Sequence, residues 1–215
     1  MALRCRRRPL YGRGTTGLAI VAGISSLAVI GNEVARVWRR GSAPLPTETP
    51  HVLGAAEEAV AETVTVAVAG YQRASERENA LLNLFSSFVI TFLSARGIAY
   101  LLRDRSSLGP FRDVFLGRRH IHHFVPGILL TFAAGSVAIA TRGERLKPKL
   151  ALAFGTGMGL TLDESALLLE LDDVYWRREG VVGVQITLAV TALLASLVLA
   201  VRLLRRGEAV VLPDA

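Results

Sequence analysis

The chain has 215 residues, of which about half are hydrophobic, and a formal net charge of +7. Its arginines flank long apolar segments instead of forming one basic, aromatic-rich surface, which argues against a nucleic-acid partner, and its single cysteine, Cys5, excludes an internal disulfide. With a mean hydropathy of +0.41, this pattern is typical of a multi-pass protein of the cell membrane.

The N-terminus combines five arginines at positions 4–13 with an apolar run at 17–37. This arrangement has the basic and apolar parts of a secretory signal peptide. The nearby small-residue triplet at 41–43 is followed by Pro44, which disfavours cleavage there. We therefore interpret residues 1–40 as a basic N-terminus and an uncleaved first membrane anchor, with the N-terminal arginines in the cytoplasm.

Residues 41–73 are predicted to form a linker followed by an amphipathic helix. The linker, 41–52, contains three prolines, and the helix is expected to begin near His51. The apolar run at 53–70 carries three glutamates, each of which costs about 2.5–3.5 kcal/mol near the centre of a membrane helix. We therefore place this helix at the membrane surface, with a sixth span as the alternative.

Residues 74–206 are predicted to form the transmembrane core, with 207–215 as a tail. A bilayer core about 30 Å thick needs roughly 20 apolar helical residues. The clearest such runs are 122–141, 150–171 and 181–201, while the run at 81–102, in a helix starting near Ser75, is interrupted by Arg96. With the N-terminal anchor, the sequence predicts an all-α transmembrane helical bundle of five spans, or six if the amphipathic helix also crosses.

Only eight residues join the runs at 122–141 and 150–171, so these runs are predicted to form an antiparallel hairpin. Positions whose numbers add up to about 291 then lie at equal depth. This places the histidines beside the carboxylates that follow the second arm, with Asp163 and Glu164 one to two turns deeper. The histidines are His120, His122 and His123, and the carboxylates include Glu170 and Asp173.

The same end of the bundle is expected to receive Arg96 from the preceding span and Tyr175 from the segment before the last span. Charged side chains inside membranes are rare and usually turn inward to pair or to line a cavity. The sequence therefore predicts a polar cluster at this end, containing Arg96, Glu170, Asp173 and Tyr175. The opposite end is expected to offer only a basic loop.

Imidazole and carboxylate groups together form the ligand set of zinc, iron or manganese. His120, His122, His123 and Asp163 are therefore candidate ligands of a divalent metal, with Glu164 as the catalytic general base. Such a site would suit metal-dependent hydrolysis of a lipid-like or amide substrate. The H-E-x-x-H signature of zinc proteases is absent from the sequence.

Four alternatives stay open beside the metal site. The histidines would also suit the headgroup zone of the bilayer, and an ion pair of Asp163 or Glu164 with Arg96 would be a structural lock between helices. Arg96, Asp163 and Glu164 would also suit an ion- or proton-coupled transporter, and a cluster that only fixes packing would suit a non-catalytic membrane scaffold. Membrane lipids are the expected partners, with protein partners and a homo-oligomer left open.

Gly155 and Gly159 stand in a G-x-x-x-G relation just before Asp163. This spacing allows a neighbouring helix to approach closely, so it predicts that the acidic residues lie inside a bundle and not against lipid.

The segments "GRRHIHHFVPGI" and "FGTGMGLTLDESALLLELDDVYW" resemble the pattern of a family of small multi-pass membrane proteins found mainly in actinobacteria. The likeness covers roughly residues 78–180 and implies no activity. A looser likeness, of chemistry only, is to alkaline ceramidases, which hold zinc with histidines and an aspartate in a helical bundle. The family resemblance supports the functional interest of Arg96, His120, His122, His123, Asp163, Glu164, Asp173, Tyr175 and Trp176.

Overall fold

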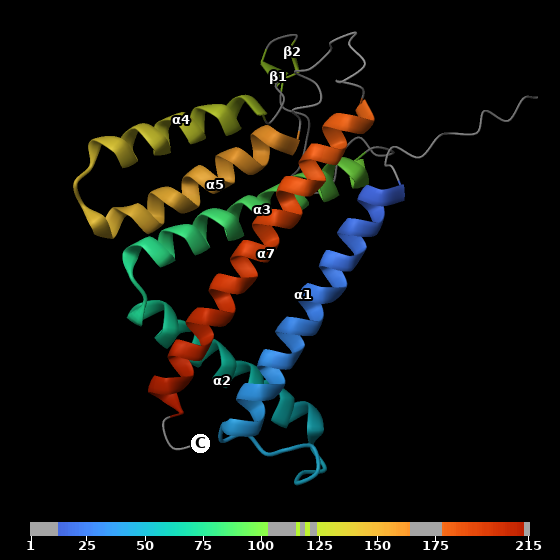
Figure 1. Cartoon of the computed structure of the whole chain (residues 1–215), viewed down its shortest axis with the longest axis vertical. Helices are drawn as coiled ribbons and strands as arrows, with labels where there is room; N and C mark the ends of the chain where they lie inside the picture. Colours follow the sequence, from blue (N-terminus) through green and yellow to red (C-terminus); the bar gives the residue numbers. More distant parts are fainter. Residues whose placement is uncertain (1–12, 103–114, 117–118, 121–123, 164–177, 213–215) are drawn as a thin grey trace, which may run out of the picture.

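The computed structural model describes residues 13–102, 115–116, 119–120, 124–163 and 178–212. These residues form an all-helical bundle, as the sequence predicts, apart from the connections and two short strands (Figure 1). The helices are α1 (Arg13–Arg40), α2 (Val52–Arg73), α3 (Glu76–Leu102), α4 (Phe124–Ala140), the short 3-10 helix η1 (Glu144–Leu146), α5 (Lys147–Asp163) and α7 (Arg178–Val211). The strands β1 (Phe115–Leu116) and β2 (Arg119–His120) pair antiparallel, with Phe115 opposite His120.

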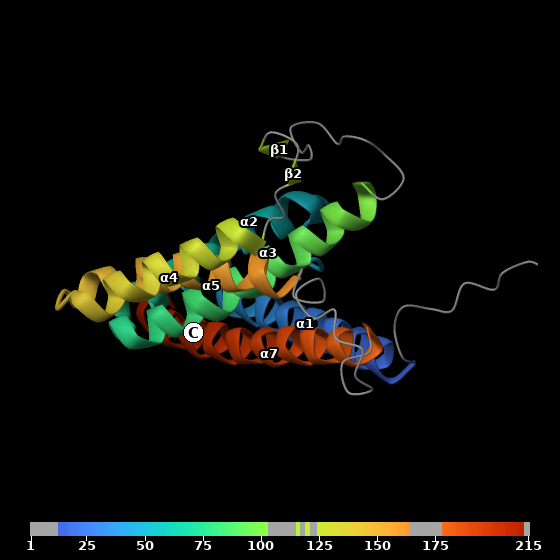
Figure 2. The same ribbon diagram turned by 90° about the horizontal axis from the view of Figure 1, so that it is seen from above.

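Two groups of helices share the bundle. Helix α5 packs between α3 and α4, while α7 packs against α1, α2 and α3 (Figures 1 and 2). Helix α2 crosses the bundle at the end where α1 and α7 finish (Figure 1). Because α3 contacts both α5 and α7, it connects the two groups.

Three helices in the described part of the chain are long and apolar enough to cross a membrane, namely Thr16–Arg40, Glu76–Ala99 and Gly183–Val211. Helix α4 is a shorter apolar helix of 17 residues, and α2 is not among the spans. The runs at 17–37 and 81–102 lie in two of these long helices. The runs at 122–141 and 150–171 extend beyond the described residues, so the count of five spans stays a prediction.

The predicted hairpin is present, but its connection is shorter than expected. Gly127 of α4 lies against Leu160 and Thr161 of α5, and Gly135 lies against Phe154. The pairing expected from sequence assumed that residues 142–149 connect the two helices. Because α5 already begins at Lys147, the observed partners in α5 lie up to about one turn closer to the connection than that pairing predicts.

The close helix approach predicted from the G-x-x-x-G spacing is confirmed. A methyl group at Gly159 would lie 2.9 Å from the backbone oxygen of Phe88, and one at Gly155 would collide with Leu84 and Ser87 of α3. Gly157 faces the other way, against α4. Helix α5 therefore packs closely on both neighbours, which brings Asp163 against α3.

The predicted helix starts are also confirmed. Helix α3 opens with a capping box, in which Ser75 N–H donates to Glu78 and Glu78 N–H donates to Ser75 Oγ, at 3.1 and 3.2 Å. Helix α2 begins immediately after His51. At the other end of the chain, α7 continues to Val211, beyond Arg206, where the sequence predicted a tail, because Gly207 and Glu208 are buried against neighbouring helices.

Two apolar clusters hold α7 in place. Phe88 and Phe92 of α3 pack with Ala189 and Ala192 of α7, and the rings of Phe88 and Phe92 are stacked with centroids 6.0 Å apart. Near the other end, a cluster of Val37, Val66 and Leu204 joins α1, α2 and α7. Each apolar cluster lies beside a group of charged residues.

Candidate functional site

Arg96 of α3 and Asp163 of α5 form an ion pair at one end of the bundle. Arg96 Nε lies 2.7 Å from Asp163 Oδ1, and Arg96 Nη2 donates to the Asp163 backbone oxygen at 2.9 Å. The Asp163 side chain is 3 % exposed, whereas that of Arg96 is 36 % exposed. The fold therefore contains the interhelical ion pair between Arg96 and Asp163, which was one of the alternatives left open by the sequence.

Gln185 of α7 completes this group, although the sequence analysis missed it. Arg96 Nη2 donates to Gln185 Oε1 at 2.9 Å, and Gln185 Nε2 donates to the backbone oxygen of Leu162 at 2.6 Å. Gln185 is 2 % exposed. We refer to Arg96, Asp163 and Gln185 as the Arg96 cluster. It joins α3, α5 and α7 through side-chain contacts.

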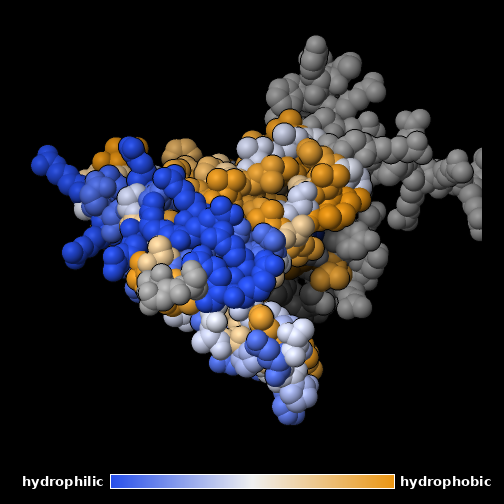
Figure 3. Space-filling view, turned by 60° about the horizontal axis from the view of Figure 1, so that its bottom comes forward, coloured by the Kyte–Doolittle hydropathy of each residue, from blue (hydrophilic) through white to orange (hydrophobic). Residues whose placement is uncertain are grey.

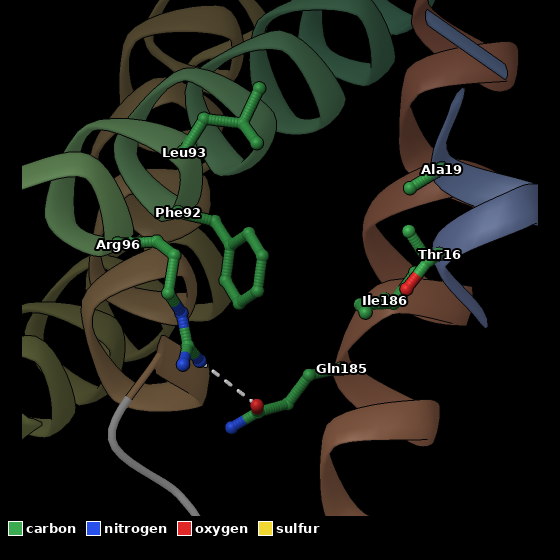
Figure 4. A pocket seen from close by; sticks show the side chains of 7 residues that line it. All are labelled: Thr16, Ala19, Phe92, Leu93, Arg96, Gln185 and Ile186. Atoms are coloured by element: carbon green, nitrogen blue, oxygen red, sulfur yellow. Dashed lines mark hydrogen bonds between the residues drawn. The ribbon is translucent and has the colours of Figure 1, made fainter. Parts of the chain in front are cut away.

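A small cavity adjoins the Arg96 cluster between α1, α3 and α7 (Figure 4). Its volume is about 240 Å³. Phe92 lies under the Arg96 guanidinium, with the ring centroid 5.6 Å from the Arg96 Cζ, so the aromatic face supports the cation. The lining is mainly apolar and consists of Thr16, Ala19, Phe92, Leu93, Arg96, Gln185 and Ile186.

Most of the predicted metal site lies outside the described residues. His122, His123 and Glu164 are in this group, as are Glu170, Asp173 and Tyr175 of the predicted polar cluster. His120 is the last residue of β2, where its backbone pairs with Phe115. Within the described ranges, no three His, Cys, Asp or Glu side chains are grouped so that they could hold a metal. The divalent metal site stays a prediction from sequence.

The opposite end of the bundle corrects the expectation of a simple basic loop. Two buried glutamates, Glu33 of α1 and Glu208 of α7, lie there among arginines. Arg205 donates to Glu33 at 2.8 Å, while Arg36 and Arg40 donate to Glu208 at 2.8 and 2.9 Å. The Glu208 side chain is only 1 % exposed, so it depends on these two arginines for its charge compensation.

Glu78 links α3 to the same end of α7. The Arg206 guanidinium donates to both Glu78 oxygens, at 2.9 and 3.2 Å, and Arg202 Nε lies 3.5 Å from Glu78 Oε1. We call all these residues together the glutamate–arginine cluster. Hydrophilic residues cover this end of the molecule (Figure 3). The cluster comprises Glu33, Arg36, Arg40, Glu78, Arg202, Arg205, Arg206 and Glu208.

These contacts define an all-helical bundle whose long apolar helices carry charged residues near both ends. No family model, curated protein or solved structure matches this chain. Proposals for its function therefore depend on the geometry of its two polar clusters and of the apolar surface between them.

Proposed function

We propose that the protein is a multi-pass integral membrane scaffold in which the two polar clusters lie at opposite boundaries of the bilayer. Gln185 and Arg205 are separated along α7 by roughly 20 residues, or about 30 Å. Glu78 and Arg96 are separated along α3 by about 27 Å. Both distances agree with a hydrocarbon thickness of about 30 Å, so each cluster lies near a headgroup region.

The exposed side chains between the clusters support this placement. Large apolar residues on the surface include Leu27 of α1, Ile90 of α3 and Val198 of α7, which are 71 %, 65 % and 67 % exposed. An apolar surface of this extent on a soluble protein would need a partner, whereas lipid chains cover it directly in a membrane.

We place α4 and α5 in the bilayer as well, which gives five spans. Each has 17 described residues, or about 25 Å, at the lower limit of the range for membrane helices. Phe132 and Ile139 of α4 are 72 % and 90 % exposed, as expected for a helix that faces lipid.

Helix α2 lies at the membrane surface in this arrangement. Its Val66 and Gly70 are buried against α7, while Leu53, Val60 and Val64 are exposed along another side. An apolar stripe of this kind on a helix with several glutamates suits the boundary between headgroups and acyl chains.

Cysteine accessibility tests the five-span arrangement. In a Cys5→Ser background, single cysteines at Gly54, Gln72, Arg142 and Leu101 are labelled with a membrane-impermeant maleimide in sealed vesicles. We expect the first three on one side and Leu101→Cys on the other. If Arg142→Cys is labelled from the side opposite to Gly54→Cys, the α4–α5 hairpin does not cross the membrane. If Gly54→Cys and Gln72→Cys are labelled from opposite sides, α2 crosses the membrane as a sixth span.

The scaffold role depends on one observation, the ion pair between Arg96 and the buried Asp163. A carboxylate held by a guanidinium is neutralised in place and is poorly suited to ligate a metal at the same time. The same geometry suits a lock that fixes α3, α5 and α7 at one depth. Metal-dependent hydrolysis would require Asp163 to exchange Arg96 for the metal.

Transport is the second candidate, because the Arg96 cluster borders a cavity between three helices. A charged pair beside a cavity in the membrane is the arrangement that a coupled carrier uses. In that function the pair would open and close during transport, whereas the scaffold requires it to remain closed.

A double-mutant cycle separates a lock from a ligand. We expect Arg96→Gln and Asp163→Asn each to destabilise the detergent-solubilised protein by roughly 1–3 kcal/mol, between the values for exposed and buried pairs. The double variant should recover part of this loss, because neither charge is left without its partner. Strictly additive losses, or loss of bound metal from Asp163→Asn without loss of stability, would contradict the scaffold.

A further inference from the structure

The cavity beside the Arg96 cluster has the form of a slot for an apolar chain with a polar group at one end. Ala19 of α1, Leu93 of α3 and Ile186 of α7 form apolar walls, while the Arg96 guanidinium lies near Gln185 (Figure 4). Leu93 is 57 % exposed, so the wall it forms reaches the outer surface of the bundle.

Arg96, which is among the residues that line this cavity, retains hydrogen-bonding capacity. Its Nε contacts Asp163, and its Nη2 donates to Asp163 and Gln185. Within the described part of the chain, these contacts leave the two N–H groups of Nη1 for a further acceptor. Each of these N–H groups can donate a charge-assisted hydrogen bond to a phosphate oxygen.

The level of the cavity suggests the source of that acceptor, and this step rests on the proposed membrane placement. The Arg96 cluster lies near one headgroup region, and the exposed Leu93 lies about one helical turn closer to the bilayer centre. A lipid whose phosphate reaches Arg96 would therefore direct its acyl chains along the apolar walls.

The size of the cavity limits the occupant. Its volume of about 240 Å³ lies below the range of roughly 300–1,000 Å³ for sites that enclose a drug-sized molecule. The cavity therefore has room for only part of one acyl chain, and the remainder of the lipid would stay in the bilayer.

We propose that this cavity binds part of one acyl chain of a bilayer phospholipid, with a headgroup phosphate oxygen accepting a hydrogen bond from Arg96. Because Asp163 already balances the charge of Arg96, the site recognises the phosphate as a hydrogen-bond acceptor and does not require a net negative headgroup.

Photocrosslinking tests this site in the full chain. The protein is reconstituted into vesicles of phosphatidylethanolamine and phosphatidylglycerol that contain a phosphatidylcholine with a photoreactive acyl chain, and crosslinked peptides are mapped by mass spectrometry. In wild type we expect labelling of the α3 and α7 segments that contain Leu93 and Ile186. Ala19→Trp, which fills the cavity from an exposed position of α1, should remove most of this labelling.

Ile90→Trp is the matched control, because Ile90 is 65 % exposed on α3 but does not line the cavity. It should leave the labelling unchanged. Arg96→Lys keeps a positive charge beside Asp163, but one ammonium cannot bond Asp163 and Gln185 and also donate from the position of Nη1. Labelling should therefore fall by about tenfold, as for the loss of a charge-assisted hydrogen bond.

Equal labelling of wild type and Ala19→Trp would overturn the lipid site. Inhibition of labelling by inorganic phosphate alone would also overturn it, because the site would then bind a free anion. Extraction of wild-type protein from membranes by alkaline carbonate would instead overturn the proposed membrane integration. If the protein resists carbonate extraction but Ala19→Trp does not reduce the labelling, the lipid site is overturned and the proposed membrane integration stands.

Discussion

Gly70 of α2 and Gly207 of α7 cross backbone to backbone. A methyl group on Gly207 would lie 2.8 Å from Gly70 N and would collide with the backbone oxygen of Val66, and one on Gly70 would collide with the backbone oxygen of Leu203. No side chain fits between the two helices at this point. The crossing therefore fixes α2 across the end of α7, next to the buried Glu208.

Replacement of Gly207 by leucine should separate α2 from α7. Overpacking of a close contact typically destabilises a protein by about 1–3 kcal/mol, and backbone atoms cannot move aside as a flexible side chain does. We expect this loss in thermal unfolding of the detergent-solubilised protein. Gly31→Ala is the control, because nothing lies within 4 Å of its added methyl group. It should be neutral, or stabilising by about 0.5–1 kcal/mol, and a similar loss in both variants would contradict the crossing.

Glu208→Gln should destabilise the glutamate–arginine cluster. The substitution keeps the shape of the side chain but leaves Arg36 and Arg40 without their shared carboxylate. Loss of one partner from a buried pair costs about 3–5 kcal/mol, and the partial exposure of both arginines reduces this toward the lower limit. Chemical unfolding measures the difference.

Glu144→Gln is the matched comparison for Glu208→Gln. Glu144 pairs with Lys147, but their side chains are 65 % and 40 % exposed, so the pair should contribute only about 0–1 kcal/mol. Equal effects of the two substitutions would show that burial of Glu208 does not strengthen its ion pairs.

Gln185→Leu should loosen the Arg96 cluster without removing a charge. Gln185 Nε2 no longer satisfies the backbone oxygen of Leu162, and Arg96 loses the acceptor at 2.9 Å. Buried polar groups that lose a partner cost about 1–3 kcal/mol each. We expect a lower unfolding temperature and faster amide exchange in the last turn of α5. Unchanged exchange there would contradict the linking role of Gln185.

The predicted metal site is tested by elemental analysis of purified wild type and of a variant with His120→Ala, His122→Ala and His123→Ala. Near-stoichiometric zinc, iron or manganese that disappears in the variant would establish the histidines as ligands. The metal content of an Asp163→Asn variant tests separately whether Asp163 is a ligand. If the aspartate is held by Arg96, as in the fold, this variant should retain any metal and lose stability.

Local patterns in the sequence predicted much of the fold because their causes are local. The helix starts near His51 and Ser75 and the close packing at the α5 glycines each depend on a few neighbouring residues, and all are confirmed. The ion pair of Arg96 with Asp163 was one of several open alternatives. Proximity in a bundle could suggest it, but only the fold shows the contact.

The missed contacts depend on helices far apart in sequence. Glu33 and Arg205 are 172 positions apart, so no local spacing connects them. Gln185 carried a usable signal, because a lone amide inside an apolar run is costly unless it has partners. Glu208 was assigned to a tail, and its burial depends on α1 and α2, which are far from it in sequence.

The partners that α7 supplies have a consequence for biosynthesis. Glu33, Glu78 and Arg96 emerge from the ribosome early, but their partners Arg205, Arg206 and Gln185 are all on the last helix. Until α7 has been made, the nascent chain holds these charges without these contacts, and in the proposed membrane placement it holds them in or near the bilayer. Synthesis of α7 is therefore the step that locks the bundle, and chains that stop short of α7 should be prime substrates for proteases.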